Sequence, residues 1–209
     1  MAAEPFLRAR HILCLGAHPD DIEIGAAGTL LRIADENADA TFRFLVLTAT
    51  GERAEEARRS AGDLLPGRVS IEVGGFRDGY LPYQDARAAK EWVAANAGEA
   101  DLVLTHTLDD RHQDHEFVAR LAWQLFRGAT ILEYEIPKWE GDRPDANLYV
   151  PLDDRLAAAK VAHLESHFAS QHGKPWYRRE VFEAVMALRG VECARRWAEG
   201  FVARKLKWG

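Results

Sequence analysis

The chain has 209 residues, a length that suits one domain with a sizeable core. Apolar residues make up 47% of it and charged residues 29%, as in ordinary globular proteins, and no apolar run approaches the roughly 20 residues that span a bilayer. The formal net charge of −6 argues against nucleic acids and anionic membranes as partners.

The two cysteines, Cys14 and Cys193, are too few and too isolated for a disulfide framework or a CxxC metal site. We therefore predict that both are buried thiols of a protein in a reducing compartment. The first six residues lack the apolar region of a signal peptide. The expectation is a cytoplasmic protein.

Strands and helices are predicted to alternate along most of the chain. Apolar runs rich in β-branched and aromatic residues indicate strands at 11–15, 41–48, 69–73, 101–106 and 130–136. Apolar stripes at helical spacing indicate helices at 24–33, 54–65, 85–97 and 116–126. This alternation predicts an α/β, Rossmann-like fold, with a mostly parallel sheet and helices on both faces.

The regular alternation of strands and helices ends after the fifth expected strand. Residues 137–147 hold Pro, Gly, Asp and Asn and are predicted to form a loop near the active edge. Beyond it we expect a short edge strand at 148–150, helices at 153–168 and 179–189, and a tail from 197 that could be strand or helix. No repeat, low-complexity tract or linker interrupts the chain, so residues 1–209 are predicted to form a single domain.

A cluster of His and carboxylates follows the first expected strand. It comprises His18, Asp20, Asp21 and Glu23. Ligands bind at the carboxyl ends of the strands in an open α/β sheet, so this turn is a candidate metal site or acid/base site. The alternative is a capping turn, in which Asp20 or Asp21 is the helix N-cap and Pro19 fixes the direction of the chain.

A second cluster follows the strand expected at 101–106. It comprises Asp109, Asp110, His112, Asp114 and His115. Both clusters follow strands of a parallel sheet and so point to the same edge. Catalytic Zn²⁺ takes three protein ligands, which two His and one carboxylate could supply. A further carboxylate could accept a proton from water, and a further His could stabilise an oxyanion or protonate a leaving group. Together the clusters favour metal-assisted hydrolysis of an amide or ester.

Several residues have simpler interpretations. Asp109 and Asp110 could form a solvent-exposed loop, and Asp114 could be a helix N-cap. The spacing of the other histidines does not require a metal role for His106, His163, His167 or His172. His163 and His167 are four residues apart but lack the Glu that follows the first His of an HExxH site.

The motif Ala17-His18-Pro19-Asp20-Asp21-Ile22-Glu23, followed by Gly25 and Gly28, resembles the PIG-L/LmbE family, as does the downstream segment 110–115 (DRHQDH). Weaker similarities lie at 50–59, at the Asp-Gly-x-Leu loop within 77–81, at Lys160 with Ser170-Gln171, and at the Ala-Glu-x-Phe of 198–201. Members of this family are metal-dependent N-deacetylases that act mostly on N-acetylglucosamine conjugates. The resemblance covers most of the chain and implies a PIG-L/LmbE-like deacetylase domain.

The resemblance also implies roles for individual residues. His18, Asp21 and His115 would ligate one divalent metal, Zn²⁺ or alternatively Fe²⁺. Asp20 would be the general base for the attacking water. His112 would stabilise the oxyanion or act as the acid, with Asp114 orienting or charging it. In this chain Gln113 stands where the family often has Pro, which leaves the pose of His112 less defined.

The substrate is expected to be a small acetylated molecule. The resemblance implies that Arg53 contacts its hydroxyls or an anionic group. The loops at 74–84 and 137–147 would shape the pocket, and Tyr80 and Trp139 are candidate contacts to a sugar ring. The favoured function is removal of an N-acetyl group from an amino sugar or glycoside conjugate. An amidase for a thiol conjugate or another acylated small molecule is the alternative, a non-enzymatic binding module is a third interpretation, and homo-oligomerisation stays open.

Overall fold

The computed structural model describes residues 8–205. Within this range the strands are β1 (His11–Gly16), β2 (Thr41–Val46), β3 (Val69–Val73), β4 (Leu102–His106), β5 (Thr130–Tyr134), β6 (Leu148–Leu152) and β7 (Trp197–Val202). The α-helices are α1 (Asp21–Glu36), α2 (Gly51–Leu64), α3 (Ala86–Asn96), α4 (Gln113–Leu125), α5 (Asp154–His167) and α6 (Arg179–Glu192). Two 3₁₀ turns are η2 (Leu81–Tyr83) and η3 (Ala169–Gln171).

The strands form one sheet in the order β3-β2-β1-β4-β5-β7-β6. Neighbours from β3 to β5 are parallel, whereas β7 runs antiparallel to both β5 and β6. The predicted α/β, Rossmann-like fold with a mostly parallel sheet is therefore confirmed. The edge strand expected near residue 148 is β6, and the ambiguous tail is strand β7.

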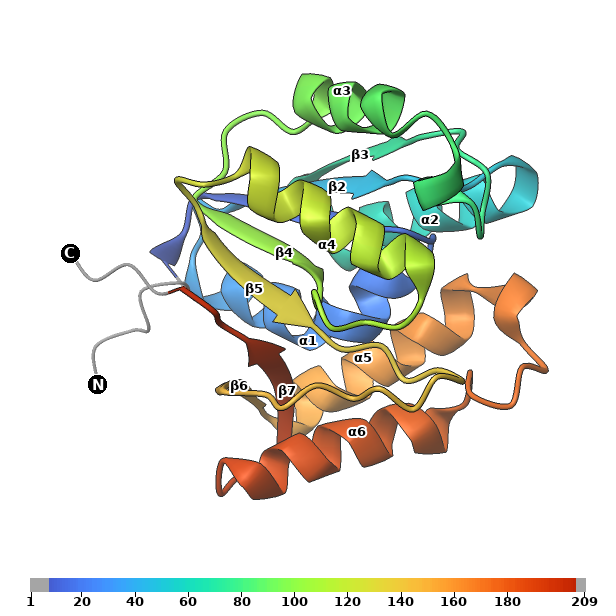
Figure 1. Ribbon diagram of the computed structural model, residues 1–209. Helices are drawn as coiled ribbons and strands as arrows, with labels where there is room; N and C mark the ends of the chain where they lie inside the picture. The colour runs from blue at the N-terminus through green and yellow to red at the C-terminus, as the bar shows by residue number, and fades with distance from the viewer. Residues whose placement is uncertain (1–7, 206–209) are drawn as a thin grey trace.

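Helices cover both faces of the sheet (Figure 1). Helices α3 and α4 pack on one face, and the core of the other face includes residues from α1, α2, α5 and α6. The period-two geometry of a strand explains how the sheet feeds both cores. In β1, Ile12 and Cys14 belong to one core, and Leu13 and Leu15 belong to the other.

The strand order reverses between β1 and β4, which lie side by side with Ile12 opposite Leu102. From β1 the chain proceeds outward to β2 and β3, and from β4 it proceeds outward to β5. The crevice at such a switch point is where doubly wound sheets bind ligands. Because both polar clusters follow these two strands, the topology brings them together.

Three helices begin earlier than predicted, at Asp21, Gly51 and Gln113. Their first turns include polar side chains of the site, which interrupt the apolar periodicity. The capping alternatives hold only in part. Asp20 occupies the N-cap position of α1 but makes no side-chain capping bond, and His112, not Asp114, is the N-cap of α4.

A buried ion pair fixes the middle of α1. Lys160 donates from Nζ to the Ile24 carbonyl and to Glu199, both at 2.6 Å. The Glu199 carboxylate also accepts from the backbone N–H groups of Gly28 and Thr29, at 2.9 and 2.7 Å. The late Lys and the closing Ala-Glu-x-Phe segment therefore anchor the helix whose first residue is Asp21.

Cys14 is buried as predicted, but Cys193 follows α6 and is only half-buried, so the prediction of its burial is wrong. None of the helices in residues 8–205 is both long and apolar enough to cross a membrane. The residues that argued against a signal peptide lie outside the described range.

Candidate active site

A cavity of about 280 Å³ opens at the carboxyl edge of β1 and β4. Most of the predicted site residues line it, namely His18, Asp20, Asp21, Arg53, His112, His115 and Trp139. Asp114 and Tyr80 are not among its lining residues. The cavity therefore joins the first turns of α1, α2 and α4 with the β5–β6 loop.

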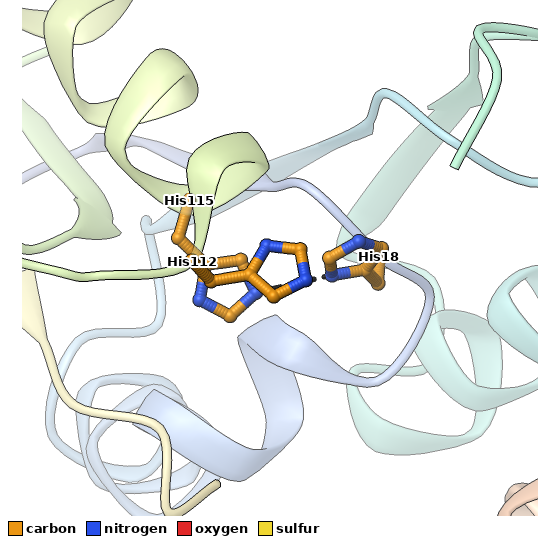
Figure 2. A group of neighbouring side chains, drawn as sticks. All are labelled: His18, His112 and His115. Atoms are coloured by element: carbon orange, nitrogen blue, oxygen red, sulfur yellow. Dashed lines mark hydrogen bonds between the residues drawn. The ribbon is translucent and has the colours of Figure 1, made fainter. Parts of the chain in front are cut away.

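The three predicted metal ligands converge at the inner end of this cavity. His18 Nδ1 lies 3.1 Å from His115 Nε2 and 3.2 Å from Asp21 Oδ2, and His115 Nε2 lies 3.5 Å from Asp21 Oδ1. Ligands bound tetrahedrally at the usual Zn–N and Zn–O lengths are about 3.3 Å apart. Figure 2 shows this contact between His18 and His115 as a dashed line, with the His112 ring beside them. The donor set and its spacing fit a divalent metal.

The outward nitrogens of these histidines face carboxylates. His115 Nδ1 lies 3.0 Å from Asp110 Oδ2, which leaves Nε2 free to ligate. His18 Nε2 lies 3.1 Å from Asp78 Oδ1 and 3.4 Å from Asp114 Oδ2. Burial of Asp110 opposes its ionisation, but hydrogen bonding and charge from His115 hold its pKa well below the usual range. The interpretation of Asp110 as a solvent-exposed loop residue is wrong, although it holds for Asp109.

His106 contributes to the site although its spacing did not indicate a role. Its ring is buried and stacks on His115 with centroids 4.0 Å apart. Its Nε2 accepts the backbone N–H of Ala17 and lies 3.2 Å from Asp21 Oδ2. Its position in the sequence could have indicated this role, because it is the last residue of an apolar strand whose carboxyl end lies at the site.

Potential metal ligands form three overlapping groups within residues 8–205, each with atoms within 4.8 Å of one another. The groups are His18/His112/His115, Asp21/His106/His115 and His18/Asp78/Asp114. His18 and His115 each occur in two of them. The geometry thus centres on these two histidines, with several carboxylates around them.

Asp20 is a buried carboxylate beside the cluster. Its Oδ1 accepts from Arg53 at 3.3 Å, and its Oδ2 has no hydrogen-bond partner among the described residues. Burial and the negative charge of Asp21 raise the pKa of Asp20. Arg53 also donates to Asp78 at 3.2 Å. A carboxylate with a raised pKa and a free oxygen can accept a proton from a bound molecule.

His112 sits at the start of α4, where its Nδ1 accepts the backbone N–H of Asp114 at 3.3 Å. Burial and the charge of His18 lower the pKa of His112. The neutral ring then carries its proton on Nε2. The Asp114 carboxylate instead accepts from the N–H groups of Gly79 and Leu81. Asp114 contacts His112 only through its backbone N–H, while its negative charge opposes the lowering of the His112 pKa. An orienting role for Asp114 stays a prediction.

The remaining candidates lie apart from the cluster. Tyr80 is 44% exposed, and its ring is covered by the Arg77 guanidinium, 4.0 Å from the centroid. Trp139 is 71% exposed at the cavity rim. Glu23 is buried against Ser60, which donates to it at 2.5 Å, and burial raises the pKa of Glu23 to about 8.

The fold and the cluster together define an α/β protein with a candidate metal site at the switch point of its sheet. The sequence model of the family described as "PIG-L: GlcNAc-PI de-N-acetylase" matches residues 13–126, more than half of the chain. The chain therefore belongs to the PIG-L family of deacetylases, as its motifs indicated.

The chain is also similar to individual proteins. The Escherichia coli (strain K12) protein YaiS, named as an uncharacterized deacetylase, is 29% identical over 176 residues, covering 77% of this chain and 91% of YaiS. The N,N'-diacetylchitobiose deacetylase of Pyrococcus horikoshii superposes with a TM-score of 0.75 at 21% identity, over 97% of this chain and 86% of its own. GalB of Pseudomonas putida KT2440, a 4-carboxy-2-hydroxymuconate hydratase, superposes at 0.72 and 18% identity, over 96% and 98%. The two structures share the fold.

Proposed function

We propose that this protein is a metal-dependent hydrolase that removes the N-acetyl group from an acetylated amino sugar or glycoside and releases acetate and a free amine. One observation carries the proposal. The inward atoms of His18, His115 and Asp21 converge within 3.1–3.5 Å, and the same cavity contains the unpartnered carboxylate oxygen of Asp20. Membership of a deacetylase family supports N-deacetylation over other hydrolyses. Because GalB has the same fold and is a hydratase, the fold alone does not identify the reaction, which has to be argued from the residues of the site.

We assign His18 Nδ1, His115 Nε2 and one oxygen of Asp21 as the metal ligands. This set is preferred to the three-histidine group because it pairs two histidines with a carboxylate, a donor set that catalytic zinc uses, and because one Asp21 oxygen lies 3.2 Å from His18 Nδ1 and the other lies 3.5 Å from His115 Nε2. It also leaves the His112 ring available to the substrate. Zn²⁺ or Fe²⁺ held there would supply Lewis-acid polarisation of the carbonyl and a lowered pKa for water.

Asp20 is assigned as the general base. Its raised pKa makes the carboxylate a better proton acceptor than an ordinary surface Asp. Arg53 holds one of its oxygens, and the other has no partner among the described residues and is left to accept the proton. Arg53 is part-buried and lines the same cavity, so it can also contact a substrate hydroxyl. The attacking water loses its proton to Asp20 as the new C–O bond forms.

His112 is assigned to the oxyanion or the leaving amine. Because its Nδ1 accepts a backbone N–H, the proton on the neutral ring lies on Nε2, where it can be donated. Donation to the oxyanion stabilises the tetrahedral intermediate. Donation to nitrogen allows the C–N bond to break and the amine to leave.

The test is acetate release from N-acetylglucosamine and a panel of its conjugates. Metal-stripped protein is compared with protein reloaded with Zn²⁺ or Fe²⁺. Asp20→Ala is run alongside Asp109→Ala, which alters an exposed carboxylate paired with Arg204. We expect metal-dependent release that Asp20→Ala abolishes and Asp109→Ala retains.

Metal content provides a second readout. Asp21→Ala should lose the bound metal, whereas His112→Ala should keep it while losing activity. The opposite pattern would favour the three-histidine group. A bound metal without acetate release from any sugar would move the assignment to a non-sugar amide, and no metal binding at all would refute the site.

A further inference from the structure

Two loops supply the outer wall of the cavity. The β5–β6 connection contributes Trp139 and Glu140, and the segment between η3 and α6 contributes Lys174 and Trp176. Both segments reach the same side of the molecule (Figure 1). Each loop thus presents one indole, and Glu140 and Lys174 carry opposite charges; Lys138 of the first loop also lines the cavity.

The other cations of the cavity wall are already neutralised. Arg53 lies 3.3 Å from Asp20 and 3.2 Å from Asp78. Lys138 lies 3.1 Å from Asp110, and its side chain is 8% exposed. The charges of Arg53 and Lys138 are compensated by carboxylates of the protein, so these two side chains attract a charged ligand only weakly.

Glu140 and Lys174 differ from them, because neither forms an ion pair with any residue in 8–205. The Glu140 side chain also makes no hydrogen bond to those residues. Its Oε2 is screened from solvent, so Oε1 is the oxygen that a ligand can reach. Lys174 donates to the neutral amide of Gln171 at 2.5 Å, which leaves further N–H donors on its ammonium. The outer cavity therefore offers one unused acceptor and one unused donor.

The two indoles provide apolar surface beside these groups. Trp139 is 71% exposed, and Trp176 is half-buried with the Lys174 ammonium 5.4 Å from its ring centroid. The face of an indole carries negative potential and attracts the polarised C–H groups on one side of a saturated ring. The ligand expected here has a flat apolar face and polar edges.

Charge complementarity narrows the class of ligand. An anionic group would pair with Lys174 but would be repelled by Glu140. A cationic group would pair with Glu140 but would be repelled by Lys174. An aliphatic group would leave both without partners. A hydroxylated ring satisfies both, because its O–H groups donate to the carboxylate and its oxygens accept from the ammonium.

We propose that Trp139, Glu140, Lys174 and Trp176 form a specificity subsite for a second, uncharged, hydroxylated ring attached to the acetylated unit. This inference rests on the proposed function, since the inner cavity is assigned to the acetamide. It selects a neutral disaccharide or polyol glycoside and disfavours both thiol conjugates and anionic second units.

Binding is measured apart from turnover by calorimetry on zinc-loaded Asp20→Ala protein. The ligands are N-acetylglucosamine, N,N'-diacetylchitobiose and N-acetylglucosaminyl-glucuronic acid. We expect the neutral disaccharide to bind about 100-fold tighter than the monosaccharide, since each of the two hydrogen bonds to a charged group is worth about tenfold. The acidic disaccharide should bind more weakly than the neutral one.

Glu140→Gln and Lys174→Met, added separately, should each weaken disaccharide binding about tenfold and leave monosaccharide binding unchanged. Glu72→Gln and Lys90→Met are the controls. Glu72 is exposed on β3, and Lys90 makes a similar contact with a glutamine, Gln124, outside the cavity.

Equal binding of mono- and disaccharide, or equal weakening of both by the variants, would overturn the subsite. Tighter binding of the acidic disaccharide would overturn its preference for an uncharged ring. The proposed function fails separately. Wild-type protein that releases no acetate, while the binding pattern holds, refutes the function and supports the subsite. Acetate release without disaccharide selectivity refutes only the subsite.

Discussion

The ion pair between Lys160 and Glu199 is expected to be a main determinant of stability. Both side chains are at most 5% exposed, and together they bind the backbone of α1 at several points. Glu199→Gln removes the negative charge and leaves the Lys160 ammonium buried without a carboxylate. Lys160→Met leaves the Glu199 carboxylate with its two backbone N–H donors alone.

Breaking one partner of a buried pair costs about 3–5 kcal/mol, because an uncompensated charge stays inside. That is a large share of a total stability of about 5–15 kcal/mol. At about 2–4 °C per kcal/mol for a chain of this size, each single variant should melt about 6–20 °C lower. The double variant removes both charges and should cost less than the two single effects combined.

The assay is thermal and urea unfolding followed by far-ultraviolet circular dichroism, at fixed metal content. Glu36→Gln is the control, because Glu36 lies on the same helix and is ion-paired with Arg32 at the surface. It should change stability by at most about 1 kcal/mol. Strictly additive single and double variants, or a Glu199→Gln effect no larger than that of Glu36→Gln, would refute the reasoning.

Three further predictions concern the outer shell of the site, helix packing and pH. Asp110→Asn should weaken zinc binding by about 10- to 100-fold in a chelator competition, because the carboxylate orients a candidate ligand; Asp109→Asn is its exposed control. Gly25→Ala should destabilise by about 1–3 kcal/mol in urea, because its Cβ would lie 2.3 Å from a tyrosine ring. Gly62→Ala, with nothing within 4 Å, should be neutral or stabilising. Burial lowers the pKa of His163 from 6.5 to about 4. Between pH 6.5 and about 4 the unfolded state therefore binds more protons than the folded state, and the stability of the fold decreases as the pH drops through this range. His163→Gln should flatten this decline in urea midpoints measured at pH 7 and 5.

Each of these expectations has a contrary result. Unchanged zinc affinity in Asp110→Asn would mean that this carboxylate does not orient the ligand. Equal stability of the Gly25 and Gly62 variants would mean that α1 can shift away from β5 at no cost. Parallel pH curves for wild type and His163→Gln would assign the decline to other groups.

The inner site was predictable because its residues are local to two strand ends. His18 and Asp21 follow β1, and His112 and His115 follow β4, so a parallel sheet was enough to bring them to one edge. The fold class followed from the same alternation of strands and helices. Helix starts were misplaced because their first turns include polar side chains of the site, which interrupt the apolar periodicity.

The groups behind the ligands were harder to predict. Asp110 is near His115 in sequence, but it is buried in an ion pair with Lys138, which comes from the β5–β6 loop. His106 is the last residue of a strand that is buried along its whole length, and it contacts Asp21. Nothing in the spacing of these residues distinguishes a buried partner from an exposed one. Burial is a tertiary property that arises from segments far apart in the chain.

The residues of the outer cavity were even harder to predict from the sequence. Its indoles and unpaired charges lie on loops with no periodic pattern, and the loops meet only because β6, α5 and α6 bring them to the site. Loops of this kind vary freely in sequence while the scaffold holds them in place. The strand ends that hold the candidate ligands are constrained by the sheet, and the loops that would contact the rest of the substrate are not. The reaction class should therefore be readable from the motifs of this chain, whereas its substrate preference has to be read from the assembled cavity.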